Sequence, residues 1–184
     1  MRISYNAPVT LTFALISTLV LVIDLATGRL LTATVFSVGP SMNLANPLEY
    51  IRLFAHVAGH LNWSHLLSNF AFILLLGPIL EEKYGSPAIL LMILITAVIT
   101  GVLNIIFLSS GLMGASGIVF MMILLVSFAN IKQGEIPLTF ILVVVLYLAR
   151  EVVTALQDDN ISQFAHIAGG VCGSLFGFLR PRKS

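Results

Sequence analysis

The stretch from residue 87 to residue 108 reads PAILLMILITAVITGVLNIIFL, and no charged residue interrupts it. A helix needs about 20 predominantly apolar residues to cross the hydrocarbon core of a bilayer. The stretch is long enough for this, so it predicts a transmembrane helix. The rest of the chain therefore has to be examined for further spans.

The composition of the whole chain also indicates a lipid environment. Of its 184 residues, 58% are hydrophobic and 9% are charged, whereas soluble domains contain about 25% charged residues. The apolar runs are long and lack the two-residue alternation of a lipid-facing β-barrel, which predicts an all-α membrane protein. We expect a single domain over residues 1–184, with six transmembrane helices near residues 9–26, 61–80, 87–108, 115–129, 136–150 and 163–179. The first run has no small-residue cleavage pattern, so we expect a retained helix and not a signal peptide.

The distribution of Lys and Arg predicts that the N-terminus and the C-terminus both lie in the cytoplasm, because cytoplasmic loops carry an excess of these residues. In this orientation the inner side would hold Arg2, Lys83, Lys132, Arg180, Arg182 and Lys183. The outer side would hold Arg29, Arg52 and Arg150. No basic cluster exists outside the C-terminal tail, so we expect no nucleic-acid partner.

Polar residues open the second, fourth and sixth predicted spans, and these three spans all run from outside to inside in the expected topology. They include His65 and Asn69 in the second span, Ser116 in the fourth and His166 in the sixth. The fourth run is short, so the irregular segment 109–115 before it is expected at membrane depth. Non-helical backbone persists there only if it is buried in protein or lines a wet cavity. The pattern predicts a functional site that is open to the outside.

A serine and a histidine in one layer suit nucleophilic acyl transfer, because an imidazole can take the proton of the serine hydroxyl. Ser116 is the candidate nucleophile and His166 the candidate base. His65 and Asn69 are four residues apart on one helical face, and both can donate hydrogen bonds to a developing oxyanion. No carboxylate lies within a span near this layer, which favours a Ser–His dyad over a triad.

Other functions are compatible with single residues of this set. A serine in a membrane helix commonly bonds a neighbouring helix, and His56, His60 and His65 are possible metal ligands. However, His65 lies about 140° around a helix from His60 at about 100° per residue, and no carboxylate is at hand. We therefore expect no metal and no cofactor. A transporter is disfavoured because the spans lack paired acidic residues and an inverted repeat.

The sixth span carries glycines at every fourth position, namely Gly169, Gly173 and Gly177. Small residues at this spacing allow a partner helix to approach to backbone contact. If that partner is the fourth span, the packing brings His166 toward Ser116. Cys172 lies among these glycines and is expected to have only a packing role.

Together these motifs resemble the rhomboid family of intramembrane proteases, from about Arg52 to Gly177. The first matching stretch is RLFAHVAGHLNWSHLLSN, residues 52–69, followed by Gly77 and Glu81-x-x-x-Gly85. The others are Gly114-Ala-Ser116-Gly117 and Ala165-His166-Ile-Ala-Gly169-x-x-x-Gly173. Several motifs in the same order and at the family's spacing make the resemblance specific.

The resemblance implies a six-helix fold with Ser116 as nucleophile and His166 as base. His65 and Asn69, with the Ser116 N–H, would form the oxyanion hole, and His60 and His56 would shape the cavity. Arg52 and Glu81 match structural positions.

The implied partners are the lipid bilayer and single-span membrane proteins, which would be cut near the outer end of their transmembrane segment. The implied location is a prokaryotic cell (inner) membrane, with several passes. The alternative is an inactive rhomboid-like protein that binds client helices, although such proteins normally lack the serine or the histidine.

Two positions depart from the family pattern. Ile51 stands where the family often has a tryptophan, which affects how the first loop, about residues 28–53, lies in the membrane. Phe120 stands where the family often has a tyrosine. Its ring can still stack on His166, but the hydroxyl is lost, so we expect tuned activity and not its loss.

Overall fold

The computed structural model describes residues 3–127 and 163–179, together with isolated positions between residues 138 and 149. The five main helices of these ranges lie where spans were expected: α1 (Pro8–Ala26), α4 (Trp63–Tyr84), α5 (Ser86–Phe107), α6 (Ser116–Ser127) and α8 (Gln163–Leu179). The predicted fifth span, residues 136–150, falls largely outside the described residues.

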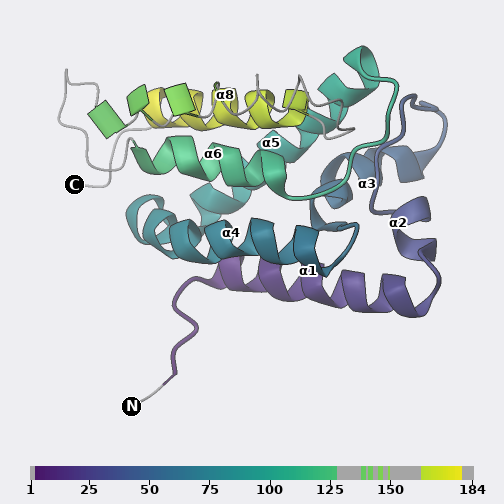
Figure 1. Ribbon diagram of the computed structural model, residues 1–184, viewed down its shortest axis with the longest axis horizontal. Coiled ribbons are helices and arrows are strands. Elements are labelled where there is room, and N and C mark those ends of the chain that lie inside the picture. The colour runs from purple at the N-terminus through teal and green to yellow at the C-terminus, as the bar shows by residue number, and fades with distance from the viewer. Residues whose placement is uncertain are drawn as a thin grey trace.

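Within the described ranges, α1, α4 and α5 are long and apolar enough to cross a membrane, whereas the described parts of α6 and α8 are shorter apolar helices. In Figure 1, α1, α4, α6 and α8 follow one another across the bundle, and α5 packs against the last three. Large apolar side chains such as Leu67 and Leu75 are exposed on α4, opposite the buried Ile73 and Leu80. A helix that is apolar on both its buried and its exposed faces fits a lipid solvent.

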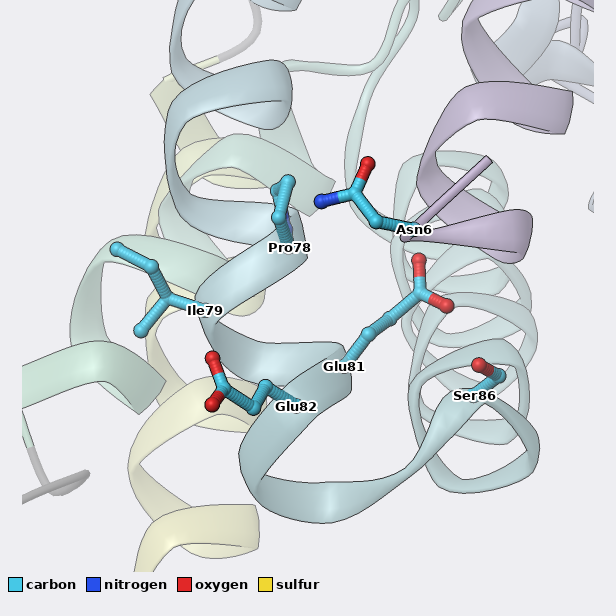
Figure 2. A pocket seen from close by; sticks show the side chains of 6 residues that line it. All are labelled: Asn6, Pro78, Ile79, Glu81, Glu82 and Ser86. Carbon is cyan, nitrogen blue, oxygen red and sulfur yellow. The ribbon is translucent and has the colours of Figure 1, made fainter. Parts of the chain in front are cut away.

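The bundle is anchored at one end by the buried carboxylate of Glu81, near the end of α4. It accepts hydrogen bonds from the N–H of Val9 at 3.2 Å, and from the N–H and the hydroxyl of Thr10, both at 2.6 Å. The first N–H groups of a helix have no partner within it, so Glu81 satisfies two of these donors on α1. Figure 2 shows Glu81 beside a pocket that Asn6, Pro78, Ile79, Glu82 and Ser86 also line.

The connection between α1 and α4 contains three short helices that the hydropathy pattern did not indicate: α2 (Leu30–Thr34), α3 (Pro47–Ala55) and the 3₁₀ helix η1 (His56–Ala58). The guanidinium of Arg52 holds this region together. It donates to the Thr34 carbonyl oxygen at 2.8 Å and to the Glu49 carboxylate at 2.6 Å. The Asn62 side chain then caps α4 by accepting from the His65 N–H at 2.8 Å.

Candidate active site

The irregular segment between α5 and α6 is held by the first loop. Val38 and Leu112 form an isolated antiparallel bridge with two N–H···O bonds of 2.9 Å. The Gly114 N–H donates to the carbonyl oxygen of His56 at 3.0 Å. Leu112, Gly114 and Ala115 are buried, whereas residues 109–111 are exposed, so the part of this non-helical backbone next to Ser116 lies within protein.

Gly114 brings the segment directly under the ring of His65. Its φ of 114° is one that side-chain-bearing residues rarely adopt. A Cβ at this position would lie 2.6 Å from Cε1 and 2.7 Å from Nε2 of His65, which leaves no room for a side chain. Glycine is required here on both grounds, and it lets the imidazole lie against the backbone two residues before Ser116.

Ser116 is the first residue of α6 and is partly exposed, while Ala115 before it and Gly117 after it are buried. The N–H groups of a helix's first turn have no intrahelical acceptor, and the helix dipole adds partial positive charge at this end. The Ser116 hydroxyl thus lies beside main-chain donors that favour an anion.

Helix α8 meets α6 through backbone contact, and its glycines make this possible. A Cβ on Gly169 would overlap the carbonyl oxygen of Gly117, and one on Gly173 would overlap that of Met121. A Cβ on Gly117 would in turn lie 3.3 Å from the carbonyl oxygen of Ala165. The helix that packs against Gly169 and Gly173 is therefore α6.

This packing places His166 beside the first turn of α6. Its ring centroid is 4.6 Å from that of Phe120, with the ring planes at 41°. Phe120 lies four residues after Ser116, on the same helical face. His166 thus packs near the helical turn that follows Ser116, and the His65 ring lies against Gly114 just before Ser116.

Asn69 lies one turn after His65 on α4 and is buried, with 6% of its surface exposed. Its amide nitrogen has no hydrogen-bond partner within the described part of the chain. A buried donor without a partner is uncommon in proteins and asks for an explanation, of which a catalytic role is one. Asn69 and His65 thus both have N–H donors, one helical turn apart on α4, for the candidate oxyanion site.

His56 and His60 lie outside the spanning helices, and each directs Nδ1 to a backbone carbonyl. His56 Nδ1 is 3.2 Å from the Arg52 oxygen, and His60 Nδ1 is 3.2 Å from the Ala58 oxygen. Burial lowers the pKa of both histidines to about 4, with the neighbouring His65 contributing at His60. Both rings are therefore neutral at pH 7. Among the described residues, no three His, Cys, Asp or Glu side chains come together to hold a metal ion.

A sequence model of the Rhomboid domain matches residues 47–183, a range that includes all of these residues except Val38. The chain belongs to the rhomboid family. It is similar to the Rhomboid protease GlpG of Haemophilus influenzae, with 25% identity over 134 residues, which are 71% of this chain and 70% of that protein. With its apolar helices, this rhomboid is an integral membrane protein.

The sequence analysis missed one group of polar residues in this rhomboid. Asp24 lies near the end of the first apolar run, and its carboxylate is fully buried and is bonded to Thr32 and Arg29. The sequence could have pointed to Asp24, because an ionisable residue within a predicted span indicates a functional or structural role. Asn104 on α5 was also missed; its amide donates to the Ser110 carbonyl at 3.0 Å and holds the loop before α6.

Proposed function

We propose that this rhomboid is an intramembrane serine endopeptidase that acts through a dyad of Ser116 and His166. The observation that carries the proposal is the contact between the rings of Phe120 and His166, at 4.6 Å. Phe120 is four residues after Ser116 and shares its helical face, so this contact supports a position of the imidazole near the serine hydroxyl. A nucleophile beside a base is the requirement for this chemistry.

In the proposed reaction, His166 takes the proton of the Ser116 hydroxyl as the serine oxygen attacks the carbonyl carbon of the scissile bond. The negative charge that develops on the carbonyl oxygen is stabilised by the N–H donors of His65, Asn69 and the Ser116 main chain. The intermediate then collapses, and His166 gives the proton to the leaving amine. Water hydrolyses the resulting ester by the same steps, which regenerates Ser116.

The proposed substrates are membrane proteins with a single span, cut near the outer end of that span. Two features support this class. The non-helical segment before Ser116 is partly buried in protein, which supports a serine below the membrane surface in the proposed orientation, with six spans and both termini in the cytoplasm. The chain also belongs to a family with a membrane protease relative, the Rhomboid protease GlpG.

The bacterial relative supports a prokaryotic cell (inner) membrane as the location. No metal or cofactor enters any step, because the dyad and the N–H donors supply the base and the electrostatic stabilisation that the reaction needs.

The test is cleavage of a generic single-span substrate by the purified protein in detergent, with Ser116→Ala beside it. Ser127→Ala is the matched control, because Ser127 lies at the other end of α6 and its hydroxyl bonds only the Ile123 carbonyl of that helix among the contacts described. We expect cleavage by the natural protein and by Ser127→Ala, and none by Ser116→Ala. If the protein binds the substrate helix but never cuts it, a client-binding role replaces the proposal.

A further inference from the structure

The turn after α1 holds an unfavourable backbone conformation at Arg29. Gly28 and Arg29 have φ values of 66° and 72°, and Arg29 is the one residue other than glycine with a positive φ in the described part of the chain. The turn accounts for Gly28, because the Arg29 N–H bonds the Asp24 carbonyl at 2.8 Å in a Schellman motif. The turn does not require Arg29 to adopt the left-handed backbone conformation as well. For a residue other than glycine this conformation is strained, and it persists only where surrounding contacts hold it.

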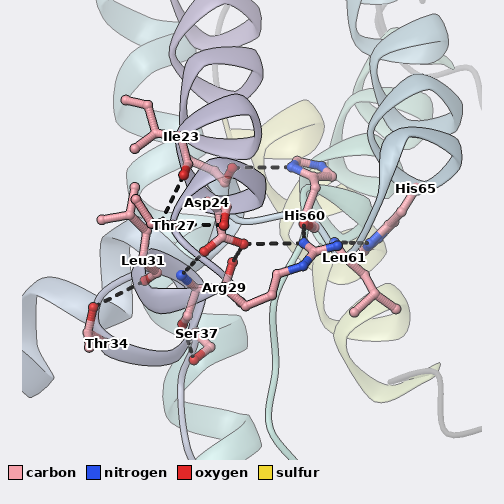
Figure 3. Close-up of polar contacts among 12 residues, drawn as sticks. Ile23, Asp24, Thr27, Arg29, Leu31, Thr34, Ser37, His60, Leu61 and His65 are labelled. Carbon is pink, nitrogen blue, oxygen red and sulfur yellow. Dashed lines mark hydrogen bonds and ion pairs between the residues drawn. The ribbon is translucent and has the colours of Figure 1, made fainter.

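The guanidinium of Arg29 is held between two acceptors, as Figure 3 shows. Nη1 donates to Asp24 Oδ2 at 3.2 Å and to the carbonyl oxygen of His60 at 3.4 Å. The Asp24 carboxylate is itself fixed, since it also accepts from the N–H and the hydroxyl of Thr32 at 2.8 and 2.6 Å. Asp24, near the end of α1, therefore holds the Arg29 guanidinium next to the His60 carbonyl oxygen, just before α4.

The His60 carbonyl and the Leu61 N–H belong to one planar peptide group. The Leu61 N–H donates to Nδ1 of His65 at 3.4 Å. A cationic donor on the oxygen of an amide polarises the group and makes its N–H a stronger donor, because linked hydrogen bonds reinforce one another. Arg29 and His65 are thus connected through a single peptide group.

This connection determines which nitrogen of His65 carries the proton. Since Nδ1 accepts from Leu61, the neutral imidazole must hold its hydrogen on Nε2. Nε2 is the nitrogen that lies against Gly114, two residues before Ser116. The tautomer that Leu61 selects is therefore the one with an N–H donor on the side of the ring that faces Gly114.

We propose that Arg29, fixed by Asp24, is a positioning residue for His65: it holds the His60–Leu61 peptide so that His65 stays in the Nε2–H tautomer and donates to the oxyanion. The proposal rests on the proposed proteolytic function for its catalytic consequence. A purely structural role, in which Arg29 and Asp24 only close the turn, predicts no change at the His65 ring when the guanidinium is removed.

The variant that tests this is Arg29→Gly, because glycine tolerates a φ of 72° and only the guanidinium is lost. Arg29→Lys keeps a cation that can donate to both acceptors. Thr27→Ala is the matched control on the same turn: Thr27 is exposed, and its hydroxyl bonds only the Ile23 and Asp24 carbonyls among the contacts described. Arg29→Gln, which keeps the length without the charge, replaces the glycine variant if that variant does not fold.

Two quantities are measured on each purified protein: kcat and KM for the single-span substrate, and the tautomer of His65 from ¹⁵N-histidine NMR. The chain has only 4 histidines, and His65→Ala identifies the signals of His65. We expect Arg29→Gly to lower kcat about 2- to 10-fold, the effect of one weakened hydrogen bond, with KM unchanged. The ring should lose its single Nε2–H form, Arg29→Lys should restore both quantities, and Thr27→Ala should change neither.

The proposal is overturned if Arg29→Gly leaves the tautomer of His65 unchanged, whatever happens to kcat, or if the tautomer changes while kcat does not. The NMR measurement needs no substrate, so it decides the connection between Arg29 and His65 by itself. An inactive natural protein would instead contradict the proposed function, and that result is separate because it is seen before any variant is made.

Discussion

Replacing Gly169 by alanine tests how closely α8 has to approach α6 for catalysis. A Cβ at this position would lie 2.7 Å from the carbonyl carbon of Gly117 and 2.9 Å from its Cα, and it would overlap the carbonyl oxygen. Contacts between carbon atoms are most favourable at about 3.5–4.0 Å, so the two helices have to separate by roughly 1 Å. The obstacle is backbone, which has no alternative rotamer to adopt.

This separation acts directly on the dyad, because His166 lies one turn before Gly169 on α8. A misplacement of about 1 Å can cost about 10²-fold in rate, so we expect kcat to fall by about that factor. Overpacking of this kind costs about 1–3 kcal/mol of stability. Alanine favours the helical conformation over glycine by about 1 kcal/mol in water. Any net loss of stability in Gly169→Ala therefore results from the lost packing against Gly117 and not from helix propensity.

The assay compares kcat for a single-span substrate with the thermal unfolding temperature, both in the same detergent. Val171→Leu is the matched control, since it adds volume to α8 between Gly169 and Gly173 but on a side chain that is 53% exposed. We expect this variant to keep its activity and its unfolding temperature. If Gly169→Ala behaves like Val171→Leu, the backbones of α6 and α8 do not touch as described and the reasoning is refuted.

Three further predictions concern the dyad, the oxyanion donors and the bonds of Glu81 to α1. Ser116→Ala and His166→Ala should each abolish cleavage without loss of helical content, and the double variant should be no worse than either, because members of a catalytic unit are not additive. His65→Ala and Asn69→Ala should each lower kcat by about 10²–10³-fold with little change in KM, which is the usual cost of one oxyanion donor. Glu81→Ala should lower the free energy of unfolding by about 2–3 kcal/mol, because it removes charged hydrogen bonds to two N–H groups of α1.

Each of these predictions has an outcome that contradicts it. Normal turnover in Ser116→Ala removes the serine from the mechanism. Loss of activity in a chelator, with recovery on adding zinc, makes the histidines metal ligands and not oxyanion donors. For the stability prediction, Glu82→Ala is the control, since Glu82 is the exposed neighbour of Glu81; equal effects of the two variants would mean that the bonds to α1 contribute nothing.

The hydropathy of the chain was sufficient to locate the main helices. The runs near 9–26 and 87–108 correspond to α1 and α5 almost to the residue, because length and apolarity decide where a helix can cross a bilayer. The short helices α2 and α3 were not foreseen. Short helices are marginal by themselves, and here α3 is tied to α2 by the tertiary hydrogen bond from Arg52 to the Thr34 carbonyl oxygen, which hydropathy does not encode.

The residues of the candidate site could be named from the sequence, but their contacts could not. The spacing of Gly169 and Gly173 indicates a close helix pair without saying which helix is the partner. The bridge between Val38 and Leu112 uses only main-chain atoms, so the residue types at these positions do not predict it. The burial of Asp24 likewise results from how the chain turns after α1, which a single residue within an apolar run does not reveal.

The bridge of Val38 to Leu112 bears on the design of a minimal fragment. The family match begins at Pro47, the first residue of α3, so a truncated protein starting there would contain every candidate catalytic side chain. It would nevertheless lack the backbone partner of the loop before Ser116, and with it Asp24, Arg29 and the helix that Glu81 binds. The segment that the family match covers is therefore shorter than the set of residues that pack together around the candidate site, and we expect a fragment without α1 to lose stability.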